Sequence, residues 1–253
     1  SNFKLGLIIN PVAGMGGKVG LHGTDNDLAQ IAISHGAEKI SFDRAQRTIS
    51  MLVTEQDNID FYSPGGVMGG ELLEMLGINF FEIDLNENLD FNKTNHLHTQ
   101  NAALKMLDHK VDVIIFAGGD GTARDVFTAV GSKVPILGIP SGVKMRSGVF
   151  ANYPEHAAMI ILDALAAAQD GKNFELTNAD VLDASIDSRE YSNSQFFGSA
   201  RTFKAPNRIT NPKVNSHSNQ DVALMELAAH LSKNLEPDRL YLFGPGQSAK
   251  AIL

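Results

Sequence analysis

The chain has 253 residues, a formal net charge of −8 and no cysteine. That length suffices for one large domain or two smaller ones; the acidic balance without a Lys/Arg-rich run excludes nucleic acid as a general partner, and the lack of thiols excludes disulfides and thiolate metal sites. No apolar run approaches the roughly 20 residues that span a bilayer, so we expect a soluble, cytoplasmic protein with no membrane partner.

The first two thirds of the chain alternate short apolar runs with helical patterns. The apolar runs predict strands at 4–9, 59–63, 80–85, 111–117 and 134–139. The apolar spacing elsewhere predicts helices at about 43–54, 68–77, 96–109, 122–131 and 154–170. Strands that alternate with helices are typical of an α/β fold, in which a mostly parallel sheet carries helices on both faces.

The pattern changes after residue 172. Apolar and polar residues alternate over 174–204, which predicts antiparallel strands. We therefore predict an α/β domain at 3–172 and a smaller, β-rich second region at 173–253.

The last part of the chain returns to the earlier pattern. A loop at 205–219 precedes a predicted helix at 219–234, and an apolar run then enters Gly244-Pro245-Gly246, as in another strand–glycine–helix unit. We predict a returning strand–helix segment at about 239–253. Because the chain stops where a helix begins, we expect the C-terminus to be truncated and the second region to be incomplete.

The most informative motif is Gly-Gly-Asp-Gly-Thr at 118–122, directly after a predicted strand. Its glycines allow close approach of the backbone to a bound group and a positive φ, and a helix start at Thr122 offers unpaired N–H groups to a phosphate. Asp120 repels phosphate oxygens unless it takes a proton, holds a metal ion or faces a second substrate. The alternative is a plain turn with Asp120 as the helix N-cap.

Ligands of open α/β sheets bind beyond the carboxyl ends of the strands. Loops of unusual composition follow four predicted strands, at 10–17, 65–70, 118–122 and 140–147. We expect these loops to converge on one crevice. In the last loop, Lys144 and Arg146 are suited to neutralise phosphate oxygens, the alternative being an ordinary solvated loop.

Familiar phosphate motifs are absent. The glycine-rich stretch at 14–18 misses the P-loop spacing, and Val19 stands where a P-loop has Ser or Thr and where a dinucleotide fingerprint has its third glycine. His96 and His98 do not have the spacing of a metal pair on one helical face. The metal ligands therefore stay unassigned.

Four segments together resemble the superfamily of NAD kinases, diacylglycerol kinases and 6-phosphofructokinases, and most closely its ATP-NAD kinase-like or AcoX-like branch. They are INPVAGMGG at 9–17, GTD at 23–25, FAGGDGTARD at 116–125 and LGIPSGVKM at 137–145. The similarity spans most of 3–170 and returns at 241–246. It implies that the α/β domain binds a nucleotide and that a β-rich domain is inserted before the chain returns.

The resemblance also implies a reaction, in which ATP, with Mg²⁺, donates a phosphoryl group to a hydroxyl of a nucleotide-like acceptor such as NAD. Asp120 is then the catalytic residue, as a general base or through a magnesium-bound water. The residues implied to hold the nucleotide are Asn10, Gly14, Gly16, Gly17, Gly118, Gly119, Gly121, Thr122, Ser141, Gly142 and Lys144. Those assigned to the acceptor substrate are Asp25, Arg124 and Arg146. The partners are a nucleotide and a small-molecule substrate, and a homo-oligomer is left open.

Several alternatives stay open beside these roles. Arg124 and Asp125 contact the nucleotide or form an ion pair on the helix surface. NAD kinases place an Asn-Glu or Asn-Asp pair after the Gly-Gly-Asp-Gly turn to bind the acceptor ribose, whereas here Asn178 and Asp180 are separated by Ala179. A lipid kinase of the diacylglycerol kinase type, disfavoured by the lack of a membrane-binding segment, and a regulator that binds ATP or NAD without turnover are the competing functions.

Overall fold

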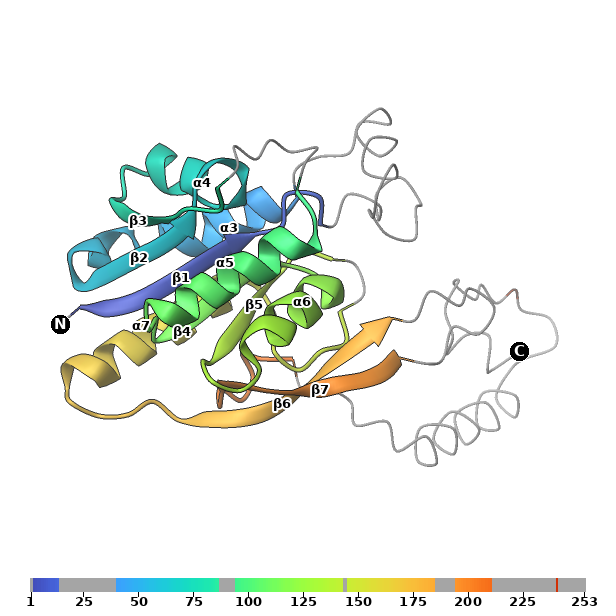
Figure 1. The fold of residues 1–253 in the computed structure, drawn as a ribbon. Helices are drawn as coiled ribbons and strands as arrows, with labels where there is room; N and C mark the ends of the chain where they lie inside the picture. Colours follow the sequence, from blue (N-terminus) through green and yellow to red (C-terminus); the bar gives the residue numbers. More distant parts are fainter. Residues whose placement is uncertain are drawn as a thin grey trace. The chain divides into compact units, whose positions relative to one another are not determined.

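The computed structural model describes residues 2–13, 40–86, 94–142, 145–184, 194–210 and 240. The chain divides into two compact units, Ser1–Pro212 and Lys213–Leu253. Apart from Leu240, the second unit lies outside the described residues, and with it the predicted helix at 219–234 and the returning segment at 239–253. The domain boundary at 172/173 stays a prediction. All elements below belong to the first unit (Figure 1).

A five-stranded parallel sheet forms the centre of this unit. Its strands are β1 (Phe3–Ile9), β2 (Ile59–Pro64), β3 (Phe80–Ile83), β4 (Val113–Gly118) and β5 (Ile136–Pro140). They lie in the order β3-β2-β1-β4-β5, and every neighbouring pair is parallel. The predicted strands are thus confirmed, with their ends shifted by at most about two residues. The direction of winding reverses between β1 and β4, which makes their carboxyl ends a topological switch point.

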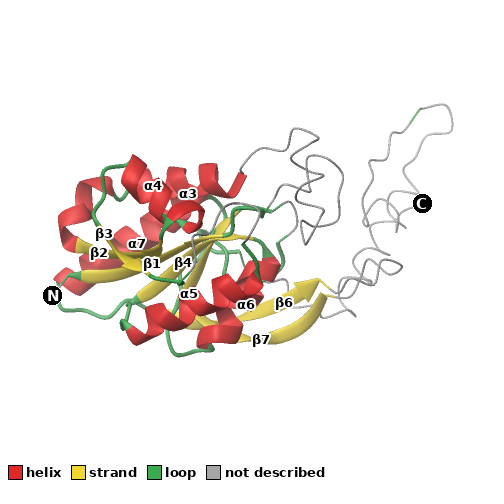
Figure 2. Ribbon diagram, turned by 45° about the horizontal axis from the view of Figure 1, so that its top comes forward, coloured by secondary structure: helices red, strands yellow, loops and turns green. Residues whose placement is uncertain are grey.

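Helices cover both faces of the sheet (Figure 2). One apolar core includes side chains of α3 (Ile40–Ser50), α4 (Gly70–Met75) and α7 (Pro154–Gln169), and the other includes side chains of α5 (His96–Asp108) and α6 (Asp120–Val130). Successive residues of β4 belong to opposite cores, as the two-residue period of a strand requires. The predicted α/β class is confirmed. None of the described helices has the length and hydropathy needed to cross a bilayer.

The helix predicted at 68–77 is interrupted at its start. Gly66 has φ 59° and Gly69 has φ 145°, which are conformations outside the helical region. The chain forms a short 3-10 turn at Gly66–Met68, and α4 begins only at Gly70. The helix predicted at 43–54 ends earlier than predicted, at Ser50, and a 3-10 helix follows at Val53–Asn58.

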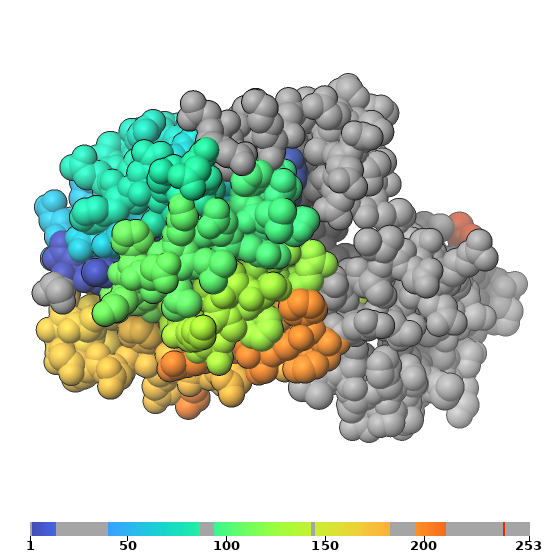
Figure 3. Space-filling view, in the orientation of Figure 1, coloured from blue at the N-terminus to red at the C-terminus, as the bar shows by residue number. Residues whose placement is uncertain are grey.

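Two long strands, β6 (Leu176–Ala184) and β7 (Ser194–Phe203), form a separate antiparallel sheet. This confirms the antiparallel strands that the alternation predicts. The hairpin packs on α6, where the rings of Phe127 and Phe197 meet edge to face at 6.1 Å. The surface of β7 adjoins that of α6 in Figure 3.

Candidate functional site

The carboxyl ends of β1, β4 and β5 lie side by side at one edge of the sheet. Backbone hydrogen bonds join the loops that follow them. Asn10 N donates to Ala117 O at 2.9 Å, and Ser141 N donates to Gly118 O at 3.1 Å. The described first residues of three of the four loops that the sequence predicts to converge therefore lie together here, and the fourth loop follows β2, which is the neighbour of β1.

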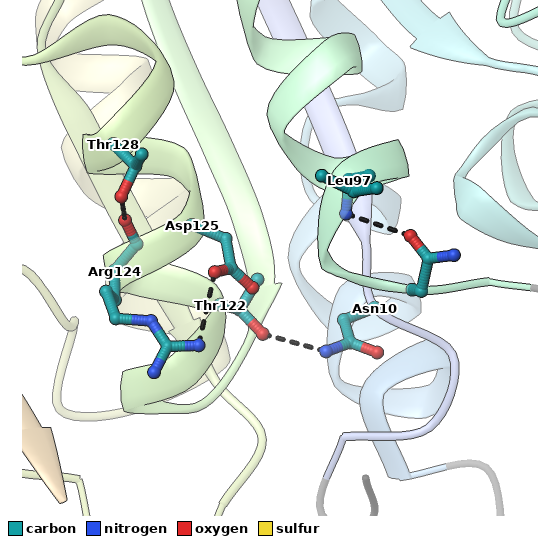
Figure 4. A network of polar contacts seen from close by, with 7 residues as sticks. Asn10, Leu97, Thr122, Arg124, Asp125 and Thr128 are labelled. Atoms are coloured by element: carbon teal, nitrogen blue, oxygen red, sulfur yellow. Dashed lines mark hydrogen bonds and ion pairs between the residues drawn. The ribbon is translucent and has the colours of Figure 1, made fainter. Parts of the chain in front are cut away.

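A side-chain hydrogen bond ties β1 to the first turn of α6. Asn10 Nδ2 donates to Thr122 Oγ1 at 2.9 Å (Figure 4), while Asn10 Oδ1 accepts from Val12 N at 3.2 Å. Thr122 is buried and lies directly over Gly118, where an added Cβ would come within 2.3 Å of Thr122 Oγ1. Gly118 is therefore needed because it leaves room for the Thr122 side chain.

The motif glycines do not use the positive φ that a glycine allows. The described glycines with positive φ are Gly66, Gly69, Gly77, Gly131 and Gly171. Gly119 has φ −116° and ψ −164°, which is extended backbone open to any residue. A Cβ added at Gly119 or Gly121 would meet no described atom within 4 Å. These two glycines leave the backbone accessible rather than relieving strain.

The N-terminus of α6 is suited to an anion. The helix begins at Asp120, two residues before the predicted start, because Gly119 is its N-cap. As a glycine, the N-cap has no side chain that could accept from the first-turn N–H groups, and these N–H groups lack partners within the helix. Together with the space over Gly119 and Gly121, this end of α6 fits a phosphate group.

The carboxylate of Asp120 is buried and faces the loop that follows β5. Oδ1 accepts from Ser147 Oγ at 2.6 Å, from Ser147 N at 2.9 Å and from Arg146 N at 3.2 Å, and Oδ2 accepts from Arg146 N at 2.9 Å. Asp120 as an N-cap is therefore wrong, since Gly119 holds that position and the carboxylate bonds to residues 26 and 27 positions away. These donors also balance part of its charge beside a phosphate site.

The two oxygens of this carboxylate differ in their remaining capacity. An ionised carboxylate has about four acceptor positions, or about two for each oxygen. Counting contacts within the described ranges, Oδ1 accepts three bonds and Oδ2 accepts one. Oδ2 of Asp120 is therefore the oxygen able to accept a further proton or a water held by a metal ion.

A magnesium ion fits this site only in company with a nucleotide. In the part of the chain that the structure describes, no group of three or more His, Asp or Glu side chains is placed to hold a metal ion. Mg²⁺ in phosphoryl-transfer sites is commonly bound by one or two carboxylates together with substrate phosphates. Asp120 Oδ2 would supply one such donor, and the phosphates would supply the others.

The imidazole of His98 has a structural role. It belongs to a capping box at the start of α5, in which Asn95 N donates to His98 Nδ1 at 3.1 Å while the Asn95 side chain accepts from Leu97 N and His98 N. Because Nδ1 is engaged by the backbone, this bond accounts for one of the two imidazoles at this helix start.

Arg124 and Asp125 form an ion pair on α6, with 3.3 Å between Arg124 Nη2 and Asp125 Oδ1 (Figure 4). Of the two alternatives for these residues, the structure thus contains the ion pair, and the contact of Arg124 with substrate stays a prediction. Burial raises the pKa of Asp125, although Arg124, His96 and Gln100 oppose this rise. The folded protein therefore holds a proton on Asp125 to higher pH than the unfolded chain does.

This raised pKa predicts a pH-dependent cost in stability. From about pH 4 upward the unfolded chain loses the Asp125 proton before the folded protein does, so the free energy of unfolding falls as pH rises through the folded pKa. Asp125→Asn removes this titration. We expect the stability of the wild type relative to Asp125→Asn, measured by urea unfolding, to decrease between pH 4 and pH 7. A constant difference, or one that grows in favour of the wild type, would contradict the assignment.

The remaining residues of the predicted site divide into two groups. Ser141 is buried, and its hydroxyl donates to Ile139 O at 3.2 Å, while a Cβ at Gly142 would lie 3.9 Å from Gly119 Cα. Arg146 is half-buried and donates its backbone N–H to Asp120. The residues that lie outside the described part of the chain are Gly14, Gly16, Gly17, Asp25 and Lys144. Their roles stay predictions.

Ser147 is the site residue that the sequence reasoning missed. It is fully buried and contacts Asp120 through both its hydroxyl and its backbone N–H. The signal that the sequence offers for Ser147 is its place at the end of the loop at 140–147. In that loop a role was predicted for the charged residues Lys144 and Arg146 and none for Ser147.

The chain was compared with models of known families. A family model described as the ATP-NAD kinase N-terminal domain matches residues 5–169. This range begins in β1, ends at the last residue of α7 and includes every described residue of the site. The comparison with curated proteins found no match to the chain.

Proposed function

The chain belongs to the ATP-NAD kinase family, and on that premise we propose that it transfers the γ-phosphoryl group of ATP to a hydroxyl of a nucleotide-like acceptor such as NAD. The observation that carries the proposal is the pairing of two features within one turn of α6. These are an N-terminus open to a phosphate group and, at its first residue, the buried carboxylate of Asp120.

The start of α6 provides the donor side of this reaction. The first-turn N–H groups and the backbone at Gly119 and Gly121, which has free space beside it, would hold phosphate oxygens of ATP. Asn10 and Ser141 support this surface from the neighbouring strands through their bonds to Thr122 and Gly118. Mg²⁺ would neutralise phosphate charge when bound with the nucleotide.

The carboxylate of Asp120 provides the acceptor side. As the acceptor oxygen forms its bond to the γ-phosphorus, the bond from that phosphorus to the β–γ bridging oxygen breaks and ADP leaves. Asp120 Oδ2 would take the proton of the acceptor hydroxyl, directly or through a water. Protein groups contribute mainly position and charge to such a transfer, since the displacement itself needs little covalent chemistry from the protein.

The acceptor class is tested by a panel of hydroxyl compounds. Purified protein is incubated with Mg²⁺, ATP labelled at the γ-phosphate and, separately, NAD, NADH, a nucleoside, a hexose or diacylglycerol in mixed micelles. The proposal predicts label in a nucleotide product and none without Mg²⁺. Label in diacylglycerol alone would overturn the proposed acceptor class and identify the protein as a lipid kinase.

A second candidate function is nucleotide binding without turnover. The observation that favours it is the full engagement of Asp120 Oδ1 by donors of the Arg146–Ser147 loop, which gives this carboxylate a structural task. ATP binding in calorimetry without label transfer to any acceptor would establish this candidate and overturn the kinase.

A further inference from the structure

We propose that Ser147 is a positioning residue, which holds the carboxylate of Asp120 in its reactive orientation and ties that orientation to the β6–β7 hairpin. This inference rests on the proposed function, since it concerns the carboxylate assigned there as the base. It is carried by a continuous chain of hydrogen bonds from the backbone of β6 through the Ser147 hydroxyl to Asp120.

The geometry fixes the direction of this chain. Ser147 Oγ lies 2.6 Å from Asp120 Oδ1, and this is the shortest of the contacts made to that carboxylate. Leu182 N donates to the same Oγ at 3.0 Å, whereas Leu182 O lies 3.4 Å from it. A hydroxyl has one proton, so the short contact identifies Asp120 as its acceptor. The N–H of Leu182 polarises the hydroxyl and thereby strengthens its bond to the carboxylate.

The pairing of the hairpin is irregular at Leu182, the residue at which this series of hydrogen bonds begins. The pairing of β6 with β7 shifts between Val181 and Leu182, because Val181 pairs with Gly198 and Leu182 with Phe196. Phe197 is thus the extra residue of a β-bulge. Bulges disrupt the ladder locally and redirect the groups beside them, and here the N–H of Leu182 is directed to Ser147.

The residues of the bulge also pack against α6, the helix that carries Asp120. Phe197 packs edge to face on Phe127 of α6, and Gly198 leaves so little space that an added Cβ would come within 2.2 Å of the Phe127 ring. On the polar side, Gly148 N donates to Asp180 O of β6 at 2.8 Å. The hairpin is therefore attached both to α6 and to the loop that holds its first carboxylate.

Loss of the Ser147 hydroxyl has a specific consequence. The carboxylate would keep its bonds to the two backbone N–H groups but lose its shortest bond, and Leu182 N–H would lose its acceptor. The start of α6, where the phosphates of ATP are expected, would be unchanged. The effect should therefore fall on kcat and spare the KM for ATP, which a merely structural role would not separate.

The test compares variants of Ser147 with a matched control elsewhere. Ser147→Ala is expected to lower kcat by roughly 10- to 100-fold, since bonds to charged groups are worth about that factor, with the KM for ATP within about twofold of the wild type. Ser147→Thr keeps the hydroxyl and should restore most of the rate. Thr48→Val removes another buried hydroxyl, on α3, which donates to Pro154 O of α7 at 2.8 Å. This variant should lower Tm without lowering kcat.

The outcomes separate this inference from the proposed function. If the wild type is active and Ser147→Ala has the same kcat, the positioning role alone is overturned. It is also overturned if Ser147→Thr loses as much kcat as Ser147→Ala does. No label transfer by the wild type would overturn the proposed function and the inference with it. If Ser147→Ala does not fold, Ser147→Cys offers a similar size with only a weak donor, and a kcat equal to that of Ser147→Thr would overturn the role.

Discussion

Asp120→Asn is expected to lower turnover by about 10² to 10⁴ while ATP still binds with the affinity of the wild type, because a positioned base contributes a factor of that order. With its oxygen in the place of Oδ1, the amide still accepts from Ser147 N and Arg146 N, so two contacts to the loop remain. It cannot take a proton from the acceptor. Steady-state kinetics of label transfer and calorimetric titration with ATP, on the same preparation, measure the two quantities.

A matched control is available on α7. Asp163 is exposed and pairs with Arg208 on the surface of the first unit, and Asp163→Asn removes the same charge away from the site. Its kcat should equal that of the wild type. Turnover of Asp120→Asn within a few-fold of the wild type would remove Asp120 from the catalytic role, whatever its effect on stability.

The second large effect is expected from alanine substitutions at two adjacent glycines, Gly118 and Gly119. An added Cβ is crowded at the first and free of contacts at the second. At Gly118, a Cβ would meet three atoms of Thr122 at 2.3 to 2.8 Å, so Gly118→Ala should displace that buried side chain and break its bond to Asn10. Overpacking of this kind costs about 1–3 kcal/mol in the free energy of unfolding. At Gly119 a Cβ meets no described atom and the backbone is extended, so Gly119→Ala should leave stability unchanged.

The binding of ATP distinguishes the pair further. If phosphate oxygens rest on the backbone at Gly119, the methyl group of Gly119→Ala occupies their place, and the affinity for ATP should fall about tenfold or more without a change in stability. Urea unfolding and ATP titration are measured for both variants. A Gly119→Ala protein that binds ATP as the wild type does would place the phosphates elsewhere.

Most of the sheet was predictable because β1, β2, β4 and β5 are apolar runs that are buried almost throughout. β4 and β5 are buried at every residue, and such strands give a continuous apolar signal. The boundaries of α4 and α6 were less predictable. They depend on backbone angles at Gly69 and Gly119, which composition does not determine, since a glycine is equally compatible with a turn, a cap and a helix.

The site was predictable as a meeting of loops but not as a set of bonds. Parallel strands end at one edge, and this rule alone brings Asn10, the motif at 118–122 and the loop at 140–147 together. The partners of Asp120 lie 26 and 27 residues along the chain, and no local pattern encodes such a contact. The same holds for Ser147, whose role depends on a bulge in a hairpin that follows it in sequence.

The proposal that this chain is a kinase acting on a nucleotide-like acceptor is tested by a single assay of phosphoryl transfer. Wild-type protein, Mg²⁺, NAD and ATP labelled at the γ-phosphate are combined, and the label in NADP and the bound ATP are measured in the same sample. We expect label in NADP that increases with time and depends on Mg²⁺. ATP that binds while no label reaches NADP would contradict NAD as the acceptor, and the same result with every nucleotide of the panel would contradict the kinase.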